Sequence, residues 1–418
     1  MNIVEVGIEE YDFFLKSESN TSFTQMSKWG AFKTNHNWKQ ELLGLYSSGE
    51  LLGVAQILYK KVPGSKYKLA YCSGGYNLID AEHEQIFNRK LAFYLKNKNC
   101  FVLKIDPYKQ IERIEQYNFA KPSTKCELGC IKNYKKLGYK HLGFYNQFEG
   151  MQPRHTFRIN TENDYNQVLE RMSSHTKRNI KLADKYDATE VISGGIELLP
   201  QFYELLEITA KRDKFSIREY DYFKSLIGTL GDNIVLSLVK LDTNKLEREL
   251  NNVSEVLNKQ ITMQQNKQNL NIKHIADLKK QLEANQSRLE EVLSYTQLSL
   301  NESFIAGNLS ITDGKNCWYL YGASSDDFKF LKPAYKLMNE MVNYCIESNL
   351  SYYDLYGVSG IFDKEHPDYG LYAFKSGFGG DLIEYIGEFD KPINYPIYIG
   401  FNKVYPKLKK LRKARARK

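Results

Sequence analysis

The feature that most constrains the fold is an order of predicted elements, strand–strand–strand–helix–strand, that occurs twice in the chain. The first copy runs from "LLGLYS" to "FVLKIDP", and the second runs from "NIVLSLVKL" to "SYYDLYG". Apolar and β-branched runs mark the strands, and the turn signals "SSGE" and "DGKN" fall between them. This duplicated order predicts an α/β (α+β) protein in which each copy forms a mixed sheet covered by helices.

Where the first copy has a four-residue turn, the second has a long insertion without Gly or Pro. Apolar residues recur in it at spacings of three and four, the period of a coiled-coil seam. They are Leu246, Leu250, Val253, Leu257, Ile275, Leu278, Leu282, Leu289 and Val292. The seam weakens across "TMQQNKQNLN", and both ends must return to adjacent strands. Residues 243–302 are therefore predicted to form an antiparallel coiled-coil arm, which suits either dimerisation or an extended partner such as transfer RNA.

The composition is typical of a soluble protein with two or three domains, since 26% of the 418 residues are charged. The sequence has no apolar run of ~18 or more residues, which a membrane-spanning helix would need. The acidic start "MNIVEVGIEEYDFF" does not look like a secretory signal. Six cysteines are scattered without a pattern, which indicates a reducing, cytoplasmic compartment.

The charge is concentrated at the C-terminus. The final "KLKKLRKARARK" holds eight of the 58 Lys and Arg residues, and the remaining 50 equal the number of Asp and Glu residues. We expect residues 399–418 to be a basic tail. Such a tail can contact anionic lipid headgroups or a nucleic-acid backbone, or it can be a solvated end without a partner.

The usual signatures of nucleophilic, nucleotide-binding and metal-dependent enzymes are missing. The sequence contains no G-x-S-x-G, P-loop, H-E-x-x-H or dinucleotide fingerprint. The pair "CELGC" has no second pair and no nearby histidine, so we predict no metal site. The candidates are therefore isolated polar residues near strand ends, where ligands of α/β sheets usually bind.

Two of these candidates are ionisable residues in apolar surroundings. Asp106 ends the predicted strand "FVLKIDP", where its carboxylate can accept a proton, hold an ammonium group or cap the following turn. Lys375 lies in "LYAFKSGFGG", which we take to be part of a half-buried strand region. A lysine there is unfavourable unless an anion meets it.

Further basic residues form weaker signals. Arg218 and Tyr222 lie close together in "KRDKFSIREYDYF", which either an anion site or an ordinary surface helix start would explain. Arg154 precedes a predicted strand in "QPRHTFRI", where it can be a linker contact. The predicted helix "MSSHTKRNIKLADKY" carries a basic cluster that can contact phosphates or form a solvated face. That cluster includes Lys177, Arg178 and Lys181.

Nine short motifs, in order over most of the chain, resemble the Fem family of peptidoglycan-bridge aminoacyltransferases (the FemA, FemB and FemX type, with the MurM and MurN relatives). They are "TQMSKWGAFK", "VLKIDPY", "MQPR", "SSHTKRNIK", "KRDKFSIREYDYF", "WYLYGASS", "YDLYGVSG", "YGLYAFKSGFGG" and "EYIGEFDKPIN". The resemblance implies two acetyltransferase-like (GNAT) domains, with an arm similar to that of seryl-tRNA synthetase inserted in the second.

The expected boundaries combine this resemblance with the repeat and the insertion. A first domain would cover residues 1–150, and a second would cover residues 151–242 and 303–398. The arm would occupy residues 243–302 between the two parts of the second domain. The basic tail would follow as residues 399–418.

The resemblance also implies a reaction. An amine on the stem peptide of a peptidoglycan precursor, lipid-linked or nucleotide-linked, attacks an aminoacyl-tRNA ester, so that an amide forms and the tRNA leaves. The ester is already activated, and no cofactor is expected beyond aminoacyl-tRNA as co-substrate. The implied partners are the charged tRNA, the precursor and related Fem-type proteins or a second copy. The implied location is the inner face of the cytoplasmic membrane, reached through the basic tail.

The resemblance assigns roles to individual residues. Lys375 would neutralise the developing oxyanion or the terminal tRNA phosphate, beside Phe374. Asp106 would orient or deprotonate the attacking amine. The implied substrate-binding residues are Lys33, Arg218, Tyr222, Tyr321 and Phe374. From their own surroundings in the sequence, Arg154 is also predicted to bind substrate, and Lys177, Arg178 and Lys181 are predicted to contact tRNA.

Two positions depart from the family pattern. Gly74 of "YCSGGYNLID" stands where relatives often have arginine, and Phe101 stands where some have tyrosine. Two rival functions also remain open. An acetyl-CoA-dependent N-acetyltransferase would need the Q/R-x-x-G-x-G/A loop, which the sequence lacks. A non-catalytic tRNA- or membrane-binding protein would need only the arm and the tail.

Overall fold

The computed structural model describes residues 1–18, 21–111, 127–146, 150–162, 164–268, 271–297 and 302–404. The chain divides into two compact units. Unit 1 comprises residues 1–158, 355–376 and 381–418, and unit 2 comprises residues 159–354 and 377–380. Each unit is described by itself below.

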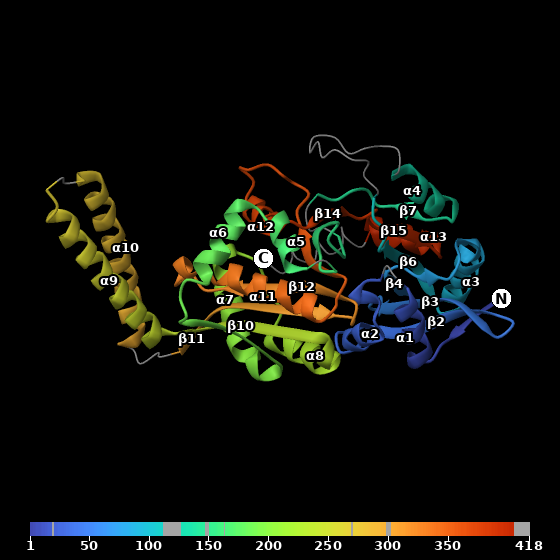
Figure 1. Cartoon of the computed structure of the whole chain (residues 1–418). Helices are drawn as coiled ribbons and strands as arrows, with labels where there is room; N and C mark the ends of the chain where they lie inside the picture. Colours follow the sequence, from blue (N-terminus) through green and yellow to red (C-terminus); the bar gives the residue numbers. More distant parts are fainter. Residues whose placement is uncertain are drawn as a thin grey trace. The chain divides into compact units, whose positions relative to one another are not determined.

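The first sheet has the strand order β1-β2-β3-β4-β6-β15-β7, with β5 paired to β3 (Figure 1). Its strands are β1 (Asn2–Glu5), β2 (Lys39–Ser47), β3 (Glu50–Lys61), β4 (Lys68–Gly74), β5 (Asn77–Leu78), β6 (Cys100–Pro107), β7 (Lys140–His141) and β15 (Phe389–Pro392). The helices of unit 1 are α1 (Ile8–Ser17), α2 (Ser27–Thr34), α3 (Glu84–Asn97), α4 (Glu127–Lys136), α12 (Tyr369–Ser376) and α13 (Tyr395–Ile399). Apolar side chains such as Leu43, Ile57 and Phe87 form the core of this unit.

The second sheet has the strand order β14-β8-β13-β12-β11-β10-β9. Its strands are β8 (His155–Asn160), β9 (Thr189–Gly194), β10 (Ile234–Asp242), β11 (Glu302–Thr312), β12 (Asn316–Ser324), β13 (Tyr352–Val358) and β14 (Asp381–Glu384). The division between the units falls within β8 and β13. The helices of unit 2 are α5 (Tyr165–Arg171), α6 (Ser174–Ala183), α7 (Leu199–Asp213), α8 (Tyr220–Leu230), α9 (Thr243–Gln265), α10 (Ile272–Thr296) and α11 (Pro333–Glu347).

The strand pairings confirm the predicted duplication. In the first copy, β2, β3 and β4 pair antiparallel, and β6 then pairs parallel to β4 after helix α3. In the second copy, β10, β11 and β12 pair antiparallel, and β13 pairs parallel to β12 after helix α11. The parallel pair in each copy requires a helical crossover, which explains why a helix occurs at the same point of both sequences.

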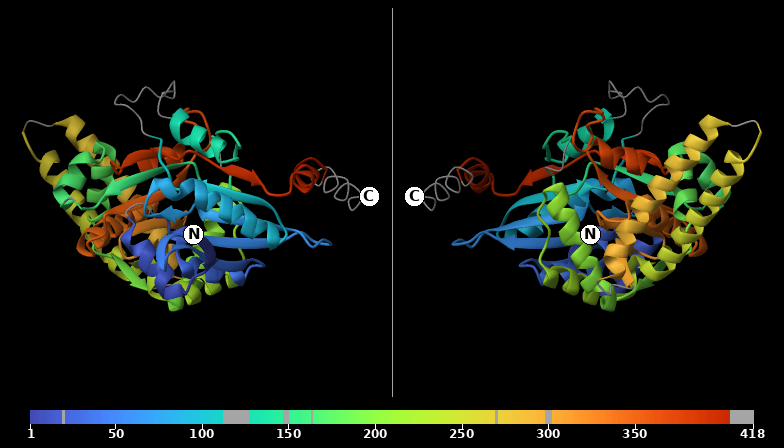
Figure 2. Two further views of the ribbon diagram at one scale, coloured as in Figure 1. Left: turned by 90° about the vertical axis from the view of Figure 1, so that its right-hand side faces the viewer. Right: turned by 90° about the vertical axis from the view of Figure 1, so that its left-hand side faces the viewer.

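The insertion in the second copy forms two long helices, α9 and α10, which lie side by side in Figure 1 and in both views of Figure 2. Leu257, Ile261 and Leu278 form a buried apolar cluster between them. Nearer the sheet, the Asn285 side chain donates to the Leu250 carbonyl at 2.8 Å. Both contacts fit an antiparallel hairpin on the predicted apolar residues. The supercoiled geometry of a coiled coil stays a prediction.

Strand β15 departs from the predicted domain boundaries. Residues 389–392 were expected in the second domain, but β15 pairs with β6 and β7 of the first sheet. The physical reason is Phe389, which is fully buried in the core of unit 1. Residues 355–376 were also expected in the second domain, but they belong to the compact unit 1. Of the predicted basic tail, residues 405–418 lie outside the described residues.

Two further observations concern the remaining sequence-based expectations. Within the described residues, none of the helices combines the length and apolar character that crossing a membrane requires. The same residues contain no group of three or more His, Cys, Asp and Glu side chains arranged to hold a metal ion. Cys126 of the "CELGC" pair lies outside the described residues, whereas Cys130 is a free, exposed thiol.

The apolar cluster of the arm leads to a stability prediction. Replacing Leu278 with Ala removes a side chain that is only 4% exposed, and it is expected to destabilise the hairpin by about 2–5 kcal/mol. Hydrogen exchange should show faster exchange in α9 and α10, with unchanged protection in β10 and β11. Val256→Ala, at a 52% exposed position, is the control and should change little. Equal effects of the two variants would contradict the hairpin packing.

Candidate active site

Asp106 occupies the carboxyl end of β6, beside the carboxyl end of β4. The parallel register aligns Asp106 with Ser73 and the next residue with Gly74. The Asp106 carboxylate accepts a hydrogen bond from the Tyr71 hydroxyl at 2.6 Å and another from the Gly74 amide at 2.8 Å. Both partners belong to β4, so these two bonds link neighbouring strands rather than cap the turn after β6. The side chain is 8% exposed.

Burial dominates the ionisation of Asp106. The pKa of its carboxyl is raised to about 7, mainly by removal from water and to a smaller extent by the nearby Glu388 carboxyl. The hydrogen bonds from Tyr71 and Gly74 favour the carboxylate and oppose this shift in pKa. A carboxyl that titrates near neutral pH is suited to accept a proton in one step and return it in a later one.

The backbone at Gly74 explains why no arginine stands there in this chain. Gly74 has φ +72°, a left-handed conformation that costs little only for glycine. A Cβ atom at this position would lie 2.8 Å from the Gln25 side chain. The Gln25 amide donates to the Asn77 side chain at 2.6 Å, which holds it in place. The conformation that brings the Gly74 amide to Asp106 therefore leaves no room for a side chain.

Lys375 lies on a helix, and its placement in a strand region was wrong. Helix α12 ends at Ser376, a glycine-rich turn follows, and strand β14 begins only at Asp381. The Lys375 side chain is 5% exposed, and its ammonium donates to the Gly357 carbonyl at 2.9 Å. Phe374, the preceding residue, is half-buried. The ammonium is thus held in a fixed position by a carbonyl oxygen, and its predicted contact with a developing oxyanion is still a prediction.

The other predicted substrate-binding residues of unit 1 differ in whether their side chains are accessible to a substrate. Lys33 is half-buried on α2, and its ammonium lies 5.3 Å from the centre of the Trp29 ring. Arg154 is 8% exposed and forms an ion pair with Glu384. Its guanidinium also lies 4.2 Å from the centre of the Phe144 ring. Arg154 therefore has a structural role, and a substrate contact would require breaking this buried pair.

A cavity of about 240 Å³ lies next to the Asp106 backbone in unit 1. Gly74 and Pro107 form part of its wall, and Glu84, Tyr108 and Lys109 add a carboxylate, a phenol and an ammonium group. The Lys109 ammonium and the Glu84 carboxylate are 3.8 Å apart. Such a mixed lining can hold a small polar group beside the strand ends.

In unit 2 the structure brings together three predicted residues from different elements. Arg218 precedes α8, Tyr222 lies on α8, and Tyr321 lies on β12. The Arg218 guanidinium is 5.4 Å from the centre of the Tyr222 ring, and the Tyr222 and Tyr321 hydroxyls hydrogen-bond to each other. Burial raises the pKa of both phenols. Both are therefore neutral hydrogen-bonding groups next to a cation.

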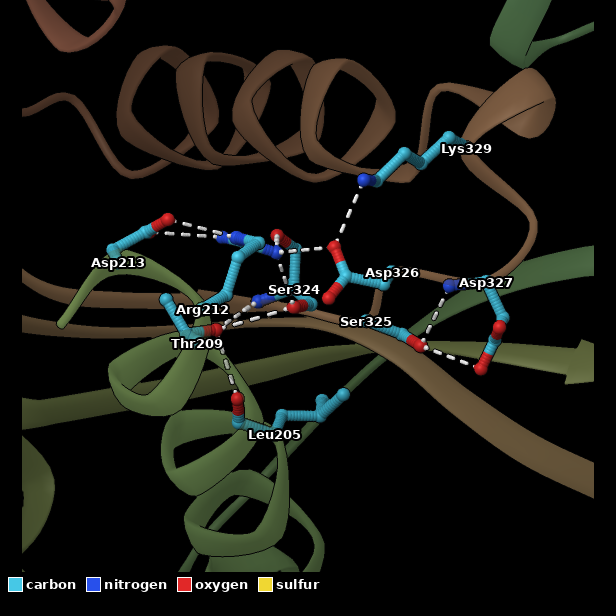
Figure 3. A network of polar contacts seen from close by, with 9 residues as sticks. All are labelled: Leu205, Thr209, Arg212, Asp213, Ser324, Ser325, Asp326, Asp327 and Lys329. Atoms are coloured by element: carbon cyan, nitrogen blue, oxygen red, sulfur yellow. Dashed lines mark hydrogen bonds and ion pairs between the residues drawn. The ribbon is translucent and has the colours of Figure 1, made fainter. Parts of the chain in front are cut away.

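A network of hydrogen bonds and ion pairs connects α7 with the end of β12, the strand of Tyr321 (Figure 3). The Arg212 guanidinium, at the end of α7, pairs with Asp326 at 3.3 Å and donates to the Ser324 carbonyl at 3.1 Å (Figure 3). The Thr209 hydroxyl accepts from the Ser324 amide at 2.9 Å. Because Ser324 ends β12, the network fixes the strand of Tyr321 against the helix that leads to Arg218.

The basic cluster on α6 lies on a helix face turned to solvent. Arg178 and Lys181 are exposed, and the Lys177 ammonium donates to the Glu170 carbonyl at 3.0 Å. The buried face of α6 consists of other residues, including Asn179 and Ile180. This arrangement fits a solvated face, and contact with tRNA phosphates stays a prediction.

Three functional candidates were missed in the sequence: Tyr71, Gln152 and Tyr356. Gln152 and Tyr356 lie within motifs that carry the family resemblance, and Tyr71 opens the stretch "YCSGGYNLID", but nothing in their spacing indicates that they hydrogen-bond. Phe101, in contrast, is fully buried and packs against Phe401, with ring centres 4.9 Å apart. The phenylalanine at that position serves the core of unit 1.

The comparison with known proteins assigns the chain to a family. The sequence profile of the FemAB family matches residues 6–406. The chain belongs to the FemAB family. It is 31% identical to the lipid II:glycine glycyltransferase of Staphylococcus aureus strain MRSA252, with 98% of this chain and 97% of that protein covered. The protein of that name from strain USA300 is 29% identical over 98% of this chain and 97% of its own length.

A solved structure supports the same assignment. The crystal structure of FemX is similar to this chain with a TM-score of 0.75 and 29% sequence identity. The match covers 95% of this chain and 99% of the FemX chain. The mixed α/β architecture predicted from the sequence is therefore that of a known Fem protein.

The buried carboxyl leads to a prediction on stability against pH. The pKa of Asp106 is about 7 in the folded protein against 3.8 for the unperturbed group, so folding favours its protonated form. Relative to Asp106→Asn, the wild type should lose stability as pH rises from about 4 to about 7, by on the order of 4 kcal/mol, and then level off. Urea unfolding across this range measures the difference. The exposed Glu50→Gln is the control, and a flat difference for Asp106→Asn would contradict the assigned environment.

Proposed function

We propose that the protein is an aminoacyltransferase that moves an amino acid from aminoacyl-tRNA to the side-chain amine of a peptidoglycan stem peptide. The observation that carries the proposal is its match, at 31% identity and over 97% of the relative's length, to a protein named lipid II:glycine glycyltransferase. The acceptor is accordingly a lipid-linked precursor of the lipid II type. The tRNA dependence follows from the reaction of the family that the sequence motifs indicate.

The proposed role of Asp106 is general base. The ammonium group of the acceptor gives a proton to the Asp106 carboxylate, and its nitrogen then attacks the carbonyl carbon of the aminoacyl ester. A tetrahedral oxyanion forms, the ester C–O bond breaks, and the ribose hydroxyl of tRNA leaves with the proton that Asp106 returns. The nitrogen, which still carries one proton more than the amide keeps, releases that proton to solvent. A pKa of about 7 allows both transfers near neutral pH.

The proposed role of Lys375 is to stabilise the oxyanion. Its ammonium is buried and already oriented by the Gly357 carbonyl, so little rearrangement is needed when negative charge develops. An ester is reactive enough toward an amine that neither a covalent intermediate nor a cofactor is proposed.

Four of the other predicted residues, Lys33, Arg218, Tyr222 and Tyr321, are proposed to bind substrate. Lys33 and Arg218 are suited to phosphate groups, and the neutral phenols of Tyr222 and Tyr321 can donate hydrogen bonds to a peptide or sugar. The basic tail is proposed to hold the protein at the inner face of the cytoplasmic membrane, where a lipid-linked acceptor is found. Its residues 407–418 lie outside the described residues.

The decisive experiment is a transfer assay with purified protein, charged tRNA and a lysine-containing lipid precursor. Mass spectrometry of the precursor should show the mass of one added amino acid. A parallel reaction replaces charged tRNA with acetyl-CoA. An acetylated product in that reaction alone would establish an N-acetyltransferase, and no product in either reaction would favour a non-catalytic binding protein.

Lys375→Met is expected to reduce kcat by about 10²- to 10³-fold, because it removes one preorganised cation from the transition state. Methionine has a similar length, so the helix should stay folded, which circular dichroism checks. Lys96→Met, at an exposed position on α3, is the matched control. Near-normal turnover of a folded Lys375→Met protein would exclude the proposed role.

Deleting residues 407–418 is expected to weaken binding to anionic vesicles, most clearly at low ionic strength, since eight basic residues are lost. Vesicle co-sedimentation at several salt concentrations measures the change. A full-length variant with glutamine at the eight basic positions separates charge from length. Unchanged binding by either variant would show that the tail is not the membrane contact.

A further inference from the structure

We propose that Gln152 and Tyr356 are positioning residues that couple Lys375 to Asp106 through a continuous chain of contacts in unit 1. The inference rests on the proposed aminoacyl transfer and adds two residues to the same site. Neither residue is expected to touch the reacting atoms.

The chain of contacts begins at Asp106 and continues through the side chains of three residues. The Tyr71 hydroxyl donates to Asp106 at 2.6 Å, and the Gln152 amide nitrogen donates to the Tyr71 oxygen at 3.5 Å. The Tyr356 hydroxyl donates to the Gln152 amide oxygen at 2.6 Å. The next residue, Gly357, provides the carbonyl that accepts from the Lys375 ammonium. The two predicted catalytic residues, Asp106 and Lys375, therefore lie at the two ends of one chain of contacts.

The backbone at Tyr356 is strained, and its surroundings hold it there. Tyr356 has φ +57°, which is uncommon for an aromatic residue. The Thr156 hydroxyl donates to its carbonyl at 2.9 Å, and the Phe23 ring lies 5.8 Å from its ring centre. Such conformations persist where neighbouring contacts over-determine them, and they are enriched at active sites. Here the left-handed turn sets the direction of the Gly357 carbonyl and thereby the position of Lys375.

The chemistry of an amide explains why glutamine stands between the two tyrosines. Its oxygen can only accept and its nitrogen can only donate, so one side chain receives the Tyr356 hydroxyl and supports the Tyr71 hydroxyl. This assignment of oxygen and nitrogen follows from the two hydroxyl partners. An amide does not readily pass protons along, so the chain orients the two catalytic groups instead of conducting protons.

This chain of contacts should also influence the pKa of Asp106, the acid at its end. Among the described residues, the titratable groups that interact electrostatically with Asp106 are Tyr71 and Cys72 on β4 and Glu388 before β15. Donation from Tyr71 lowers the pKa of the Asp106 carboxyl, and donation from Gln152 lowers the pKa of Tyr71 and so strengthens it as a donor. Loss of Gln152 should therefore raise the pKa of Asp106.

The test compares Gln152→Leu and Tyr356→Phe with Tyr59→Phe. The Tyr59 hydroxyl donates to the buried Glu41 at 2.6 Å, so its removal breaks the same type of bond elsewhere in unit 1. The Gln152→Leu and Tyr356→Phe substitutions should each lower kcat about tenfold or more, with little change in KM for the lipid precursor. In Gln152→Leu the acidic limb of the kcat/KM profile should move to higher pH. In Tyr59→Phe that limb should not move.

A second readout does not depend on activity. It compares the stability of each protein with that of the same protein carrying Asp106→Asn. The pH at which this difference levels off reports the pKa of Asp106 in the folded state. This point should move to higher pH in the Gln152→Leu background. If neither this point nor the acidic limb moves, while the melting temperature and kcat fall together, the two residues are only structural and the inference is wrong. If the wild type transfers no amino acid, the proposed function fails, and the stability readout still decides the coupling.

Discussion

The site of unit 1 depends on one interaction, the hydrogen bonding of a buried carboxyl between two parallel strands. Asp106 at the end of β6 reaches the Tyr71 hydroxyl and the Gly74 amide of β4. These bonds require the parallel register of the two strands and a left-handed backbone at Gly74. They partly offset the loss of hydration, so the acid is held near its point of half-ionisation instead of being fully neutral. The duplicated module thus does more than build a core, because its parallel strand pair creates the environment of the acid.

Unit 2 organises its candidate residues by a different physical means. The Arg212 network is partly exposed and consists of ion pairs and backbone contacts that individually contribute little to stability. Its effect is geometric, since it ties the end of β12 to the end of α7 (Figure 3). Tyr321 therefore lies on a strand that is tied to α7, the helix before the segment of Arg218. A rigid support of this kind is what binding residues on a loop and a helix start require.

The sequence allowed the repeated elements, the helical hairpin and the end position of Asp106 to be predicted, because each has a local signal. Apolar periodicity marks the hairpin, and turn residues separate the strands. Two placements could not be predicted in this way. Strand β15 has only four residues and joins the first sheet through the buried Phe389. Helix α12 has only eight residues, so tertiary contacts rather than local propensity decide that Lys375 is helical.

The contacts between distant residues were also inaccessible from the sequence alone. Gln152 and Tyr356 are separated by 204 positions, and no periodic pattern links an isolated glutamine to an isolated tyrosine. The positive φ of Tyr356 likewise leaves no mark on the residue type. Family motifs located these segments, but only the folded chain shows which polar atoms meet.

The most direct test of this account is the titration of Asp106 itself in the intact protein. With ¹³C-labelled aspartate carboxyl groups, the resonance that disappears in Asp106→Asn can be followed by NMR as a function of pH. The account predicts a midpoint at about 7. A midpoint near the ordinary aspartate value of 3.8 would show that the carboxyl is hydrated and would contradict its role as a base that operates near neutral pH.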